Sequence, residues 1–324
     1  MNIRGCRSHL SPWKDENGDY KWYGRFNMGV VSLNIVQIAI LAKGDLDKFR
    51  ELLKQRLDLC KDALLVRREL LMDTPSDISP IHWQHGGLAR LRKGEKINKL
   101  LSGGYSTLSL GYVGIHEAVQ ALIGKSHTTP EGEKLALEIM QTMKDATDSW
   151  KKETGLGFGL YGTPAESLVY RFCSIDRKKF GEIKNVTDRL YYTNSYHVHV
   201  TEKMDAFDKL KFESQFHAIS SGGCISYIEV PNMSKNIPAM ISIIRYIYDN
   251  VQYAEINSRP DVCYKCNFTG EMDYDTITES WACPQCGNTD KEEMQVMRRT
   301  CGYISTNNWN KGKIQEINER VMHL

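Results

Sequence analysis

Four cysteines near the end of the 324-residue chain have the spacing of a metal site. Cys263 and Cys266 form one Cys-X2-Cys pair, and Cys283 and Cys286 form a second pair after sixteen intervening residues. Each pair can place two thiolates on one side of a tetrahedral ion, and this spacing favours zinc over an iron–sulfur cluster. Because four protein ligands leave no open coordination position, we expect a structural zinc ribbon.

A zinc ribbon that binds nucleic acid is the alternative interpretation of this spacing. The segment 267–276 between the two pairs carries acidic side chains and no lysine or arginine. Nucleic-acid phosphates require basic side chains, so the sequence does not favour nucleic acid as a partner.

A glycine between bulkier neighbours follows the last cysteine pair, in the run Arg298-Arg-Thr-Cys-Gly302-Tyr303. Glycine has no Cβ, so a radical on its α-carbon can flatten between the two flanking amides without crowding. Taken alone, Gly302 is more typical of a turn, and Cys301 beside it is typical of a small packing residue. Only the rest of the tail distinguishes a radical-bearing glycine from a turn glycine.

The tail as a whole resembles the C-terminus of anaerobic (class III) ribonucleoside-triphosphate reductases. The resemblance rests on the two cysteine pairs, on the segment 299–304 and on the run from Asn310 to Val321. In that family the glycine that matches Gly302 carries a stored glycyl radical. The resemblance implies this role for Gly302 and a radical-SAM activase with an iron–sulfur cluster as the partner that installs the radical.

Two segments near the N-terminus resemble the same family. Cys6, in Arg4-Gly-Cys-Arg-Ser8, matches the finger-loop cysteine whose thiyl radical takes the ribose 3′-hydrogen. Asn27 matches an active-site asparagine, and its neutral amide offers both a donor and an acceptor to a small reductant or a ribose hydroxyl. His197 and His199 could ligate a metal, but such a pair without a third ligand is more often structural.

A possible phosphate loop lies in the middle of the chain. Thr163 can cap a helix, and Pro164 suits the first helical position, so the free N–H groups of that turn would face an anion. An ordinary capped helix is the alternative. Similar loops bind substrate phosphates in ribonucleotide reductases, which implies a substrate role for the segment Thr163, Pro164, Ala165, Glu166 and Ser167. The pattern Gly157-X-Gly159-X-X-Gly162 follows a charged helix end rather than a strand and does not indicate a dinucleotide site.

Apolar periodicity predicts the elements that must position these residues. Helices are expected over 45–70, 130–152 and 237–249, and strands over 30–33, 190–200 and 225–230. Helices interleaved with strands indicate an α/β core. The resemblance implies the C-terminal half of a ten-stranded glycyl-radical-enzyme α/β barrel. We expect a partial barrel at 1–257, a zinc ribbon at 258–295, and a radical loop with a terminal helix at 296–324.

The composition restricts where the protein acts. The net charge is +2, and no apolar run approaches the roughly 20 residues needed to span a bilayer. The odd count of nine cysteines and their paired spacing favour reduced thiols and metal over disulfides. We therefore expect a cytoplasmic protein without a membrane partner.

The resemblance covers essentially the whole chain but only about half of the usual family length. Because Met1 is present, we expect a split enzyme, of a phage-like form, whose N-terminal portion is a separate chain. A fragment or an inactive remnant is the alternative. The resemblance implies reduction of ribonucleoside triphosphates with formate as reductant, in a dimer of the assembled enzyme. A non-catalytic zinc-ribbon interaction protein is the competing function.

Overall fold

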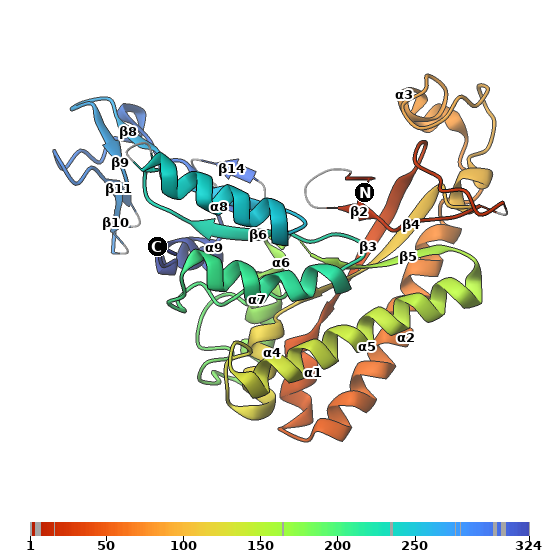
Figure 1. Cartoon of the computed structure of the whole chain (residues 1–324), viewed down its shortest axis with the longest axis horizontal. Coiled ribbons are helices and arrows are strands. Elements are labelled where there is room, and N and C mark those ends of the chain that lie inside the picture. Colours follow the sequence, from red (N-terminus) through yellow and green to blue (C-terminus); the bar gives the residue numbers. More distant parts are fainter. Residues whose placement is uncertain are drawn as a thin grey trace. The chain divides into compact units, whose positions relative to one another are not determined.

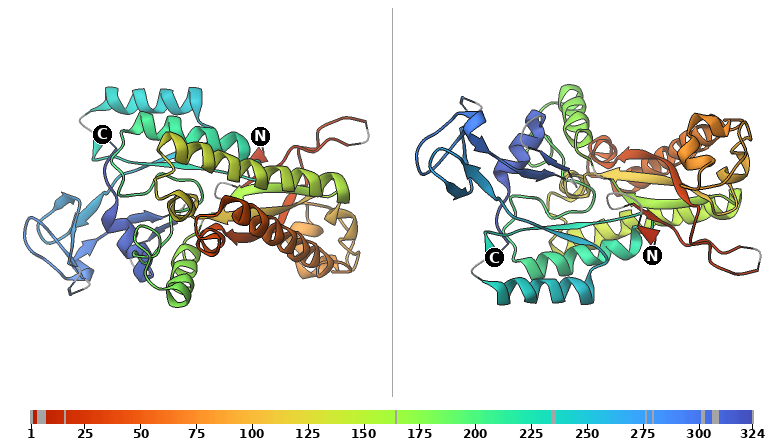
Figure 2. Two further views of the ribbon diagram at one scale, coloured as in Figure 1. Left: turned by 90° about the horizontal axis from the view of Figure 1, so that it is seen from below. Right: turned by 90° about the horizontal axis from the view of Figure 1, so that it is seen from above.

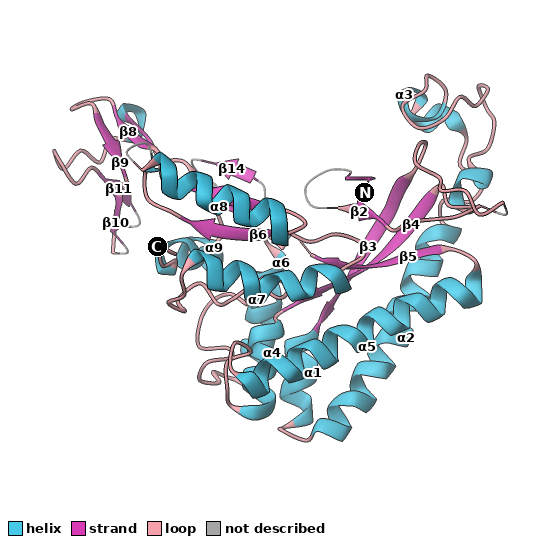
Figure 3. Cartoon of the chain, viewed as in Figure 1, coloured by secondary structure: helices cyan, strands magenta, loops and turns pink. Residues whose placement is uncertain are grey.

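The computed structural model describes residues 2–3, 8–15, 17–163, 165–233, 236–275, 277–278, 280–300, 303–305 and 309–323. Internal contacts divide the chain into two compact units. Unit 1 comprises residues 1–163, 194–196 and 215–224, and unit 2 comprises residues 164–193, 197–214 and 225–324. Both contain helices and strands (Figure 3), which confirms the α/β class. The ten-stranded barrel and the three-part domain division remain predictions.

Unit 1 is built on a parallel sheet (Figure 1). Its three strands are paired in the order β3 (Phe26–Asn34), β4 (Ser106–Val113) and β5 (Gly157–Gly162). Parallel strands need long crossover connections, and the helices of unit 1 supply them. The expected strand at 30–33 is confirmed within β3.

The strands of this sheet differ in burial. Every residue of β4 and β5 is buried, whereas β3 buries only Met28 and Leu33. Beyond β5 the backbone continues the sheet, since the Gly222 N–H donates to the Leu160 carbonyl at 2.7 Å. The half-buried β3 is therefore the less covered edge of the sheet.

Four helices connect and cover the strands of unit 1. They are α1 (Ile35–Ala42), α2 (Leu46–Glu69), α4 (Ile115–Ile123) and α5 (Pro130–Thr154). Asp45 caps α2 by accepting from the N–H groups of Asp47 and Lys48, and Thr129 caps α5. Both helices contact the sheet and cross one face of it (Figure 2). The expected helices at 45–70 and 130–152 are confirmed.

Shorter elements complete unit 1. They are β1 (Asn2–Ile3), β2 (His9–Leu10), α3 (Pro80–Trp83), and the short 3-10 helices at Ser76–Ile78 and Asn98–Leu101.

Unit 2 contains a βαβ element formed by β6 (Ser226–Glu229), α8 (Ile237–Asn250) and β7 (Ala254–Asn257). The two strands pair in parallel, and Ile228, Ile243 and Leu210 lie in the apolar cluster beneath them. Leu210 comes from α7 (Ala206–Ile219), and α6 (Leu168–Phe180) precedes it in the chain. The helix at 237–249 and the strand at 225–230 are confirmed. On α8, however, Ile243 is buried while Ile241 and Ile244 are 43% and 51% exposed.

The tail of unit 2 consists of very short strands and one helix. The elements are β8 (Asp261–Cys263), β9 (Phe268–Gly270), β10 (Asp273–Asp275), β11 (Ser280–Ala282), a 3-10 turn at Lys291–Glu293, β12 (Met294–Gln295), β13 (Arg298–Thr300), β14 (Tyr303–Ser305) and α9 (Lys311–Glu319). The antiparallel pairs are β8 with β9 and β12, β10 with β11, and β13 with β14.

The strand expected at 190–200 is absent from the structure, so that prediction is wrong. Its apolar residues include Tyr191 and Tyr192, which are buried, but its backbone bonds to side chains and to scattered backbone groups rather than to a neighbouring strand. The Leu190 N–H donates to Gln315 Oε1 at 3.0 Å, and the Val198 N–H donates to Glu213 Oε1 at 3.0 Å. Among the described residues, no helix is both long and apolar enough to cross a bilayer.

Candidate functional site

The four predicted ligand cysteines come together in the tail of unit 2. Their Sγ atoms all lie within 4.8 Å of one another. The Sγ atoms of Cys263 and Cys286 are 3.7 Å apart, and those of Cys266 and Cys283 are 3.6 Å apart. A tetrahedral zinc ion with Zn–S bonds of about 2.3 Å separates its sulfurs by about 3.8 Å. The thiolates therefore fit zinc. The prediction that these four cysteines form a cluster able to hold a metal is confirmed, and bound zinc remains a prediction.

Local backbone geometry favours the thiolate form of Cys263. Burial opposes ionisation of the Cys263 thiol, but N–H donors from Cys266 and Lys265 lower its pKa to about 6. Asn288 adds a side-chain contact, with Nδ2 3.7 Å from the Cys263 Sγ. In the second pair, the Gly287 N–H donates to the Cys283 carbonyl at 2.8 Å, closing a tight turn with a Gly287 φ of +67°. Such donors orient thiolate ligands and stabilise their charge.

An arginine just after the ribbon is buried against it. Arg298 Nη1 donates to the two carboxylate oxygens of Asp261 at 2.5 and 2.6 Å. Its guanidinium also lies over the Trp281 ring, 4.6 Å from the ring centroid. Asp261 comes two residues before Cys263, and Trp281 comes two residues before Cys283. This contact was not predicted from the sequence. The signal that could have indicated it is an acidic and an aromatic residue placed two positions before the first cysteine of each pair.

The next arginine belongs to a different set of contacts. Arg299 Nη2 lies 2.6 Å from Glu255 Oε1 on β7, and the Arg299 carbonyl accepts from Arg320 Nη1 at 2.8 Å. Arg320 also pairs with Glu229 and with Glu316. Burial opposes ionisation of Glu316, but the charges of Lys313 and Arg320 hold its pKa at about 2.

Asn27 lies on β3 at a register shift of the sheet. Its Nδ2 donates to Ser109 Oγ at 2.8 Å, and its Oδ1 accepts from the Gly29 N–H at 2.8 Å. The strand pairing shifts between Asn27 and Gly29. The two bonds use one N–H hydrogen and one carbonyl lone pair of the amide, which has two of each. The side chain is thus held in place by neighbours in unit 1 while keeping further hydrogen-bonding capacity.

Thr163 follows β5 directly and is buried. Its Oγ1 is 3.0 Å from Ser32 Oγ on β3, across the intervening strand β4. Gly111 of β4 makes this possible, because a Cβ at that position would collide with both hydroxyl oxygens. The hydroxyl of Thr163 is therefore engaged within unit 1.

The helix expected to start at Pro164 begins later. Helix α6 starts at Leu168, its N-cap residue is Ser167, and the Ser167 side chain makes no capping bond. The expectation that Thr163 caps this helix is wrong, because its hydroxyl pairs with Ser32 instead. Ala165 is buried, and the Glu166 carbonyl accepts from Asn310 Nδ2, the N-cap of α9, at 3.4 Å. The first turn of α6 thus lacks a side-chain cap from Ser167.

Several predicted site residues lie outside the described part of the chain. They are Cys6, Pro164, Cys301 and Gly302. Their roles remain predictions from the resemblance. Thr300 and Tyr303, which flank Cys301 and Gly302 in the sequence, pair with each other in the β13–β14 hairpin.

The two candidate metal-ligating histidines have structural partners. His197 Nδ1 is 3.4 Å from Glu213 Oε1, and His199 Nδ1 is 2.8 Å from Thr201 Oγ1. Burial, together with the charge of Arg189, lowers the pKa of His199 to about 4. Neither histidine belongs to a group of three or more ligand side chains among the described residues. The glycines of the dinucleotide-like pattern lie within β5 rather than in a loop, which agrees with its rejection.

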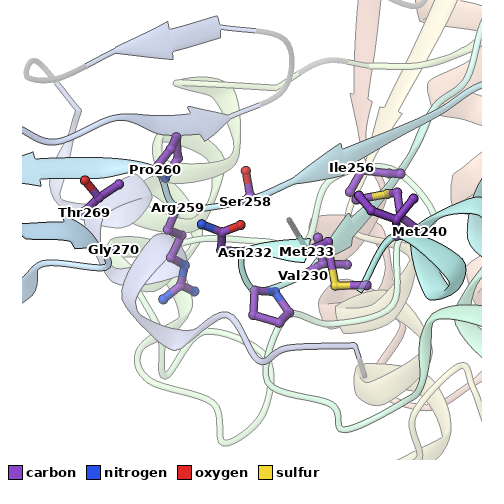
Figure 4. A pocket seen from close by; sticks show the side chains of 12 residues that line it. Val230, Asn232, Met233, Met240, Ile256, Ser258, Arg259, Pro260, Thr269 and Gly270 are labelled. Atoms are coloured by element: carbon purple, nitrogen blue, oxygen red, sulfur yellow. The ribbon is translucent and has the colours of Figure 1, made fainter. Parts of the chain in front are cut away.

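A pocket of about 390 Å³ lies at the carboxyl ends of β6 and β7. Figure 4 shows Val230, Met233, Met240 and Ile256 at one end of it, with Arg259 towards the other. The charge of Arg259 is paired with Glu271, and burial lowers its pKa. The pocket is therefore largely apolar, without an uncompensated charge from Arg259 for an anion.

Comparisons with known proteins agree with the resemblance. In fold, the chain is similar to the anaerobic ribonucleotide reductase from Thermotoga maritima with glycerol in the active site, with a TM-score of 0.65 and 22% identity. That match covers 93% of this chain and 46% of the other. The chain thus shares the fold of about half of that reductase.

Sequence comparison identifies the family. The family model described as anaerobic ribonucleoside-triphosphate reductase matches residues 1–323. The chain is 40% identical over 326 residues to the anaerobic ribonucleoside-triphosphate reductase of Escherichia coli (strain K12), covering 99% of this chain and 46% of that protein. It is also 40% identical over 328 residues to that of Enterobacteria phage T4, covering 98% of this chain and 52% of the relative.

The chain therefore belongs to the anaerobic ribonucleoside-triphosphate reductase family. It spans about half the length of the curated relatives it matches.

Proposed function

We propose that this chain supplies the radical-bearing part of an anaerobic ribonucleoside-triphosphate reductase. The observation that carries the proposal is the family match over residues 1–323, which includes both the Cys6 segment and the tail. The thiol cluster of the tail supports the proposal, because its four cysteines lie within the residues that the family model matches. A bound zinc ion would cross-link the two cysteine pairs and order the segment around them.

The chemistry divides between the two ends of the chain. A radical-SAM activase with an iron–sulfur cluster removes one hydrogen from the Gly302 α-carbon. In the presence of substrate, Gly302 regains hydrogen from Cys6, and the Cys6 thiyl then takes the ribose 3′-hydrogen. The 2′-hydroxyl takes up a proton and leaves as water. Formate supplies two electrons as it is oxidised to carbon dioxide and a proton, and these electrons with one proton form the new C–H bond at C2′. Cys6 finally returns the 3′-hydrogen, giving the 2′-deoxyribonucleoside triphosphate.

Described residues would hold the substrate for these steps. Hydrogen bonds with Ser109 and with the Gly29 N–H hold the Asn27 amide in one orientation. Its second N–H hydrogen and second carbonyl lone pair would bind a ribose hydroxyl or formate. In the segment 163–167, the first turn of α6 has no side-chain cap from Ser167, and free N–H groups at a helix start favour a phosphate.

The active assembly also needs the part of the family length that this chain does not span. The edge strand β3 is only half-buried, which supports additional chain beside it. We propose an N-terminal portion, carried on a separate polypeptide, in a cytoplasmic enzyme that is dimeric when assembled.

The test is anaerobic reconstitution with the N-terminal portion, the activase, S-adenosylmethionine, a ribonucleoside triphosphate and formate. We expect deoxynucleotide, an organic radical by electron paramagnetic resonance, and backbone cleavage at Gly302 when oxygen is admitted. Gly302→Ala should abolish all three. Cys6→Ser should abolish turnover but leave the radical, because storage and hydrogen abstraction are separate steps.

Asn27→Ala is the graded variant, because a positioning residue should lower turnover without abolishing it. A radical at a residue other than Gly302, or turnover that survives Cys6→Ser, would defeat the proposal. Zinc binding with no radical and no turnover in the full assembly would instead favour a non-catalytic interaction protein or an inactive remnant.

A further inference from the structure

We propose that Arg298 is a positioning residue that couples the zinc ribbon to the β13–β14 hairpin, whose strands flank Gly302 in the sequence. The inference rests on the proposed function for its catalytic meaning. The coupling itself is carried by contacts between described residues. Asp261 lies beside the first cysteine pair and Trp281 lies beside the second, and both contact the Arg298 side chain. Through these contacts the ribbon orders the hairpin.

Residues beside each of the two cysteine pairs contact Arg298. The Arg298 side chain is 5% exposed and the Asp261 side chain is 0% exposed, so their ion pair is shielded from water. Asp261 lies on β8, which leads into the first cysteine pair, and Trp281 lies on β11, which leads into the second. A metal ion bound by both pairs would also fix the separation of Asp261 and Trp281. It would therefore fix the position of the Arg298 side chain between them.

Successive residues of a strand face opposite sides, which explains why Arg298 and Arg299 have different partners. Arg298 points to the ribbon, whereas Arg299 pairs with Glu255 on β7. The Arg299 carbonyl is held in addition by Arg320, which follows α9. The base of the hairpin is thus fixed to the ribbon on one side and to the βαβ element and terminal segment on the other.

Arg298 is separable from the integrity of the ribbon. Asp261 also accepts from the N–H groups of Met272, at 2.9 Å, and Met297, at 3.0 Å. Loss of the guanidinium would therefore leave the Asp261 carboxylate with two donors. Arg298 is not a thiolate ligand, so its replacement should release the hairpin while the cysteines keep their metal.

The decisive experiment measures amide hydrogen exchange of residues 296–305 in the unactivated chain, with zinc content measured in parallel. Arg298→Gln should retain one zinc per chain and raise hairpin exchange by at least about tenfold, since breaking a buried ion pair is costly. Arg298→Lys should lie between, because lysine keeps the charge but loses the planar contact with Trp281. Lys209→Gln is the control, because it breaks another buried ion pair of unit 2, with Glu213 on α7.

A double-mutant comparison tests whether the coupling runs through Arg298. Cys283→Ser should also raise hairpin exchange, and the double variant with Arg298→Gln should exchange no faster than Cys283→Ser alone. Independent, multiplicative effects would overturn the inference. So would unchanged hairpin exchange in Arg298→Gln, or an equal rise in the Lys209→Gln control.

The catalytic consequence is measured separately in the activated assembly. Arg298→Gln should lower the radical per chain and the oxygen-dependent cleavage at Gly302 at least about threefold, with zinc retained. Wild-type protein that forms no radical would refute the proposed function while leaving the exchange result to decide the coupling. A wild-type radical yield in Arg298→Gln would overturn the positioning role.

Discussion

The parallel sheet of unit 1 and the tail of unit 2 are held together by different physical means. All eight residues of β4 are buried, among them Leu108, Leu110 and Tyr112. In the tail, the strands from β8 to β14 contain two or three residues each, and buried positions include Asp261 and Arg298. Burial of a large apolar area stabilises the sheet, whereas the tail depends on its four thiols, on ion pairs and on a small apolar cluster that includes Met272 and Val296.

The two regions should therefore respond differently to substitutions: the sheet carries Asn27, whereas the tail carries the proposed radical residue. Strands of two or three residues bury too little area to fix a backbone on their own. A tail that depends on its thiols and ion pairs should lose its order when either is removed. The sheet that carries Asn27 should be insensitive to the same changes.

The largest expected effect is loss of the tail on removal of one thiolate. Cys283→Ser should lower zinc from one ion per chain to none, because a structural site with three thiolates loses most of its affinity. The segment 261–305 should then become sensitive to limited proteolysis, while the sheet of unit 1 keeps its protection. Metal analysis and mapping of the cleavage sites measure both outcomes.

A tail that stays protected without metal would contradict the contrast between the two regions. Cys60→Ser is the matched control. Cys60 is a buried thiol of α2, outside the metal cluster, whose pKa burial raises to about 11. It should leave the zinc content unchanged.

A smaller effect is expected from crowding the sheet at Gly111. An alanine Cβ there would collide with Ser32 Oγ and Thr163 Oγ1, so Gly111→Ala should cost about 1–3 kcal/mol of unfolding free energy. The displaced Thr163 should also weaken substrate binding if the segment 163–167 holds phosphate. Denaturant unfolding measures the first effect, and the Michaelis constant of the reconstituted enzyme measures the second.

Relief of the crowding provides the control for this prediction. Ser32→Ala removes one of the two hydroxyls, so the Ser32→Ala/Gly111→Ala double variant should recover part of the lost stability. Equal stability of Gly111→Ala and the wild type would show that Gly111 has no spacing role.

The sequence predicted what depends on short-range patterns. Cysteine spacing predicted the four-cysteine cluster, and apolar periodicity predicted α2, α5 and α8. It did not show that Tyr191 and Tyr192 are buried without a strand, because the side chains that satisfy that segment are distant in sequence. The Leu190 N–H bonds Gln315, 125 residues away. The contacts of Arg298 and Thr163 were missed for the same reason, since their partners are 37 and 131 residues away.

The smallest predicted effect is a pH dependence of unit 2 that arises from His323. Burial, together with the charge of Lys209, lowers the pKa of His323 to about 4, and its Nδ1 accepts from the Glu229 N–H at 2.8 Å. An acceptor nitrogen must be unprotonated, so the folded state binds this proton less readily than the unfolded chain, whose histidine pKa is about 6.5. The resulting stability is fully present above about pH 6.5 and is lost as the pH falls towards 4.

Between about pH 7 and pH 5.5 this linkage should remove about 1 kcal/mol of unfolding free energy. His323→Asn keeps a side-chain acceptor but cannot be protonated in this range, so its stability should fall by about 1 kcal/mol less over the same interval. Denaturant unfolding at both pH values, with the exposed His85→Asn variant of unit 1 as control, measures the difference. An identical pH dependence in His323→Asn and wild type would show that the buried C-terminal segment does not sense this proton.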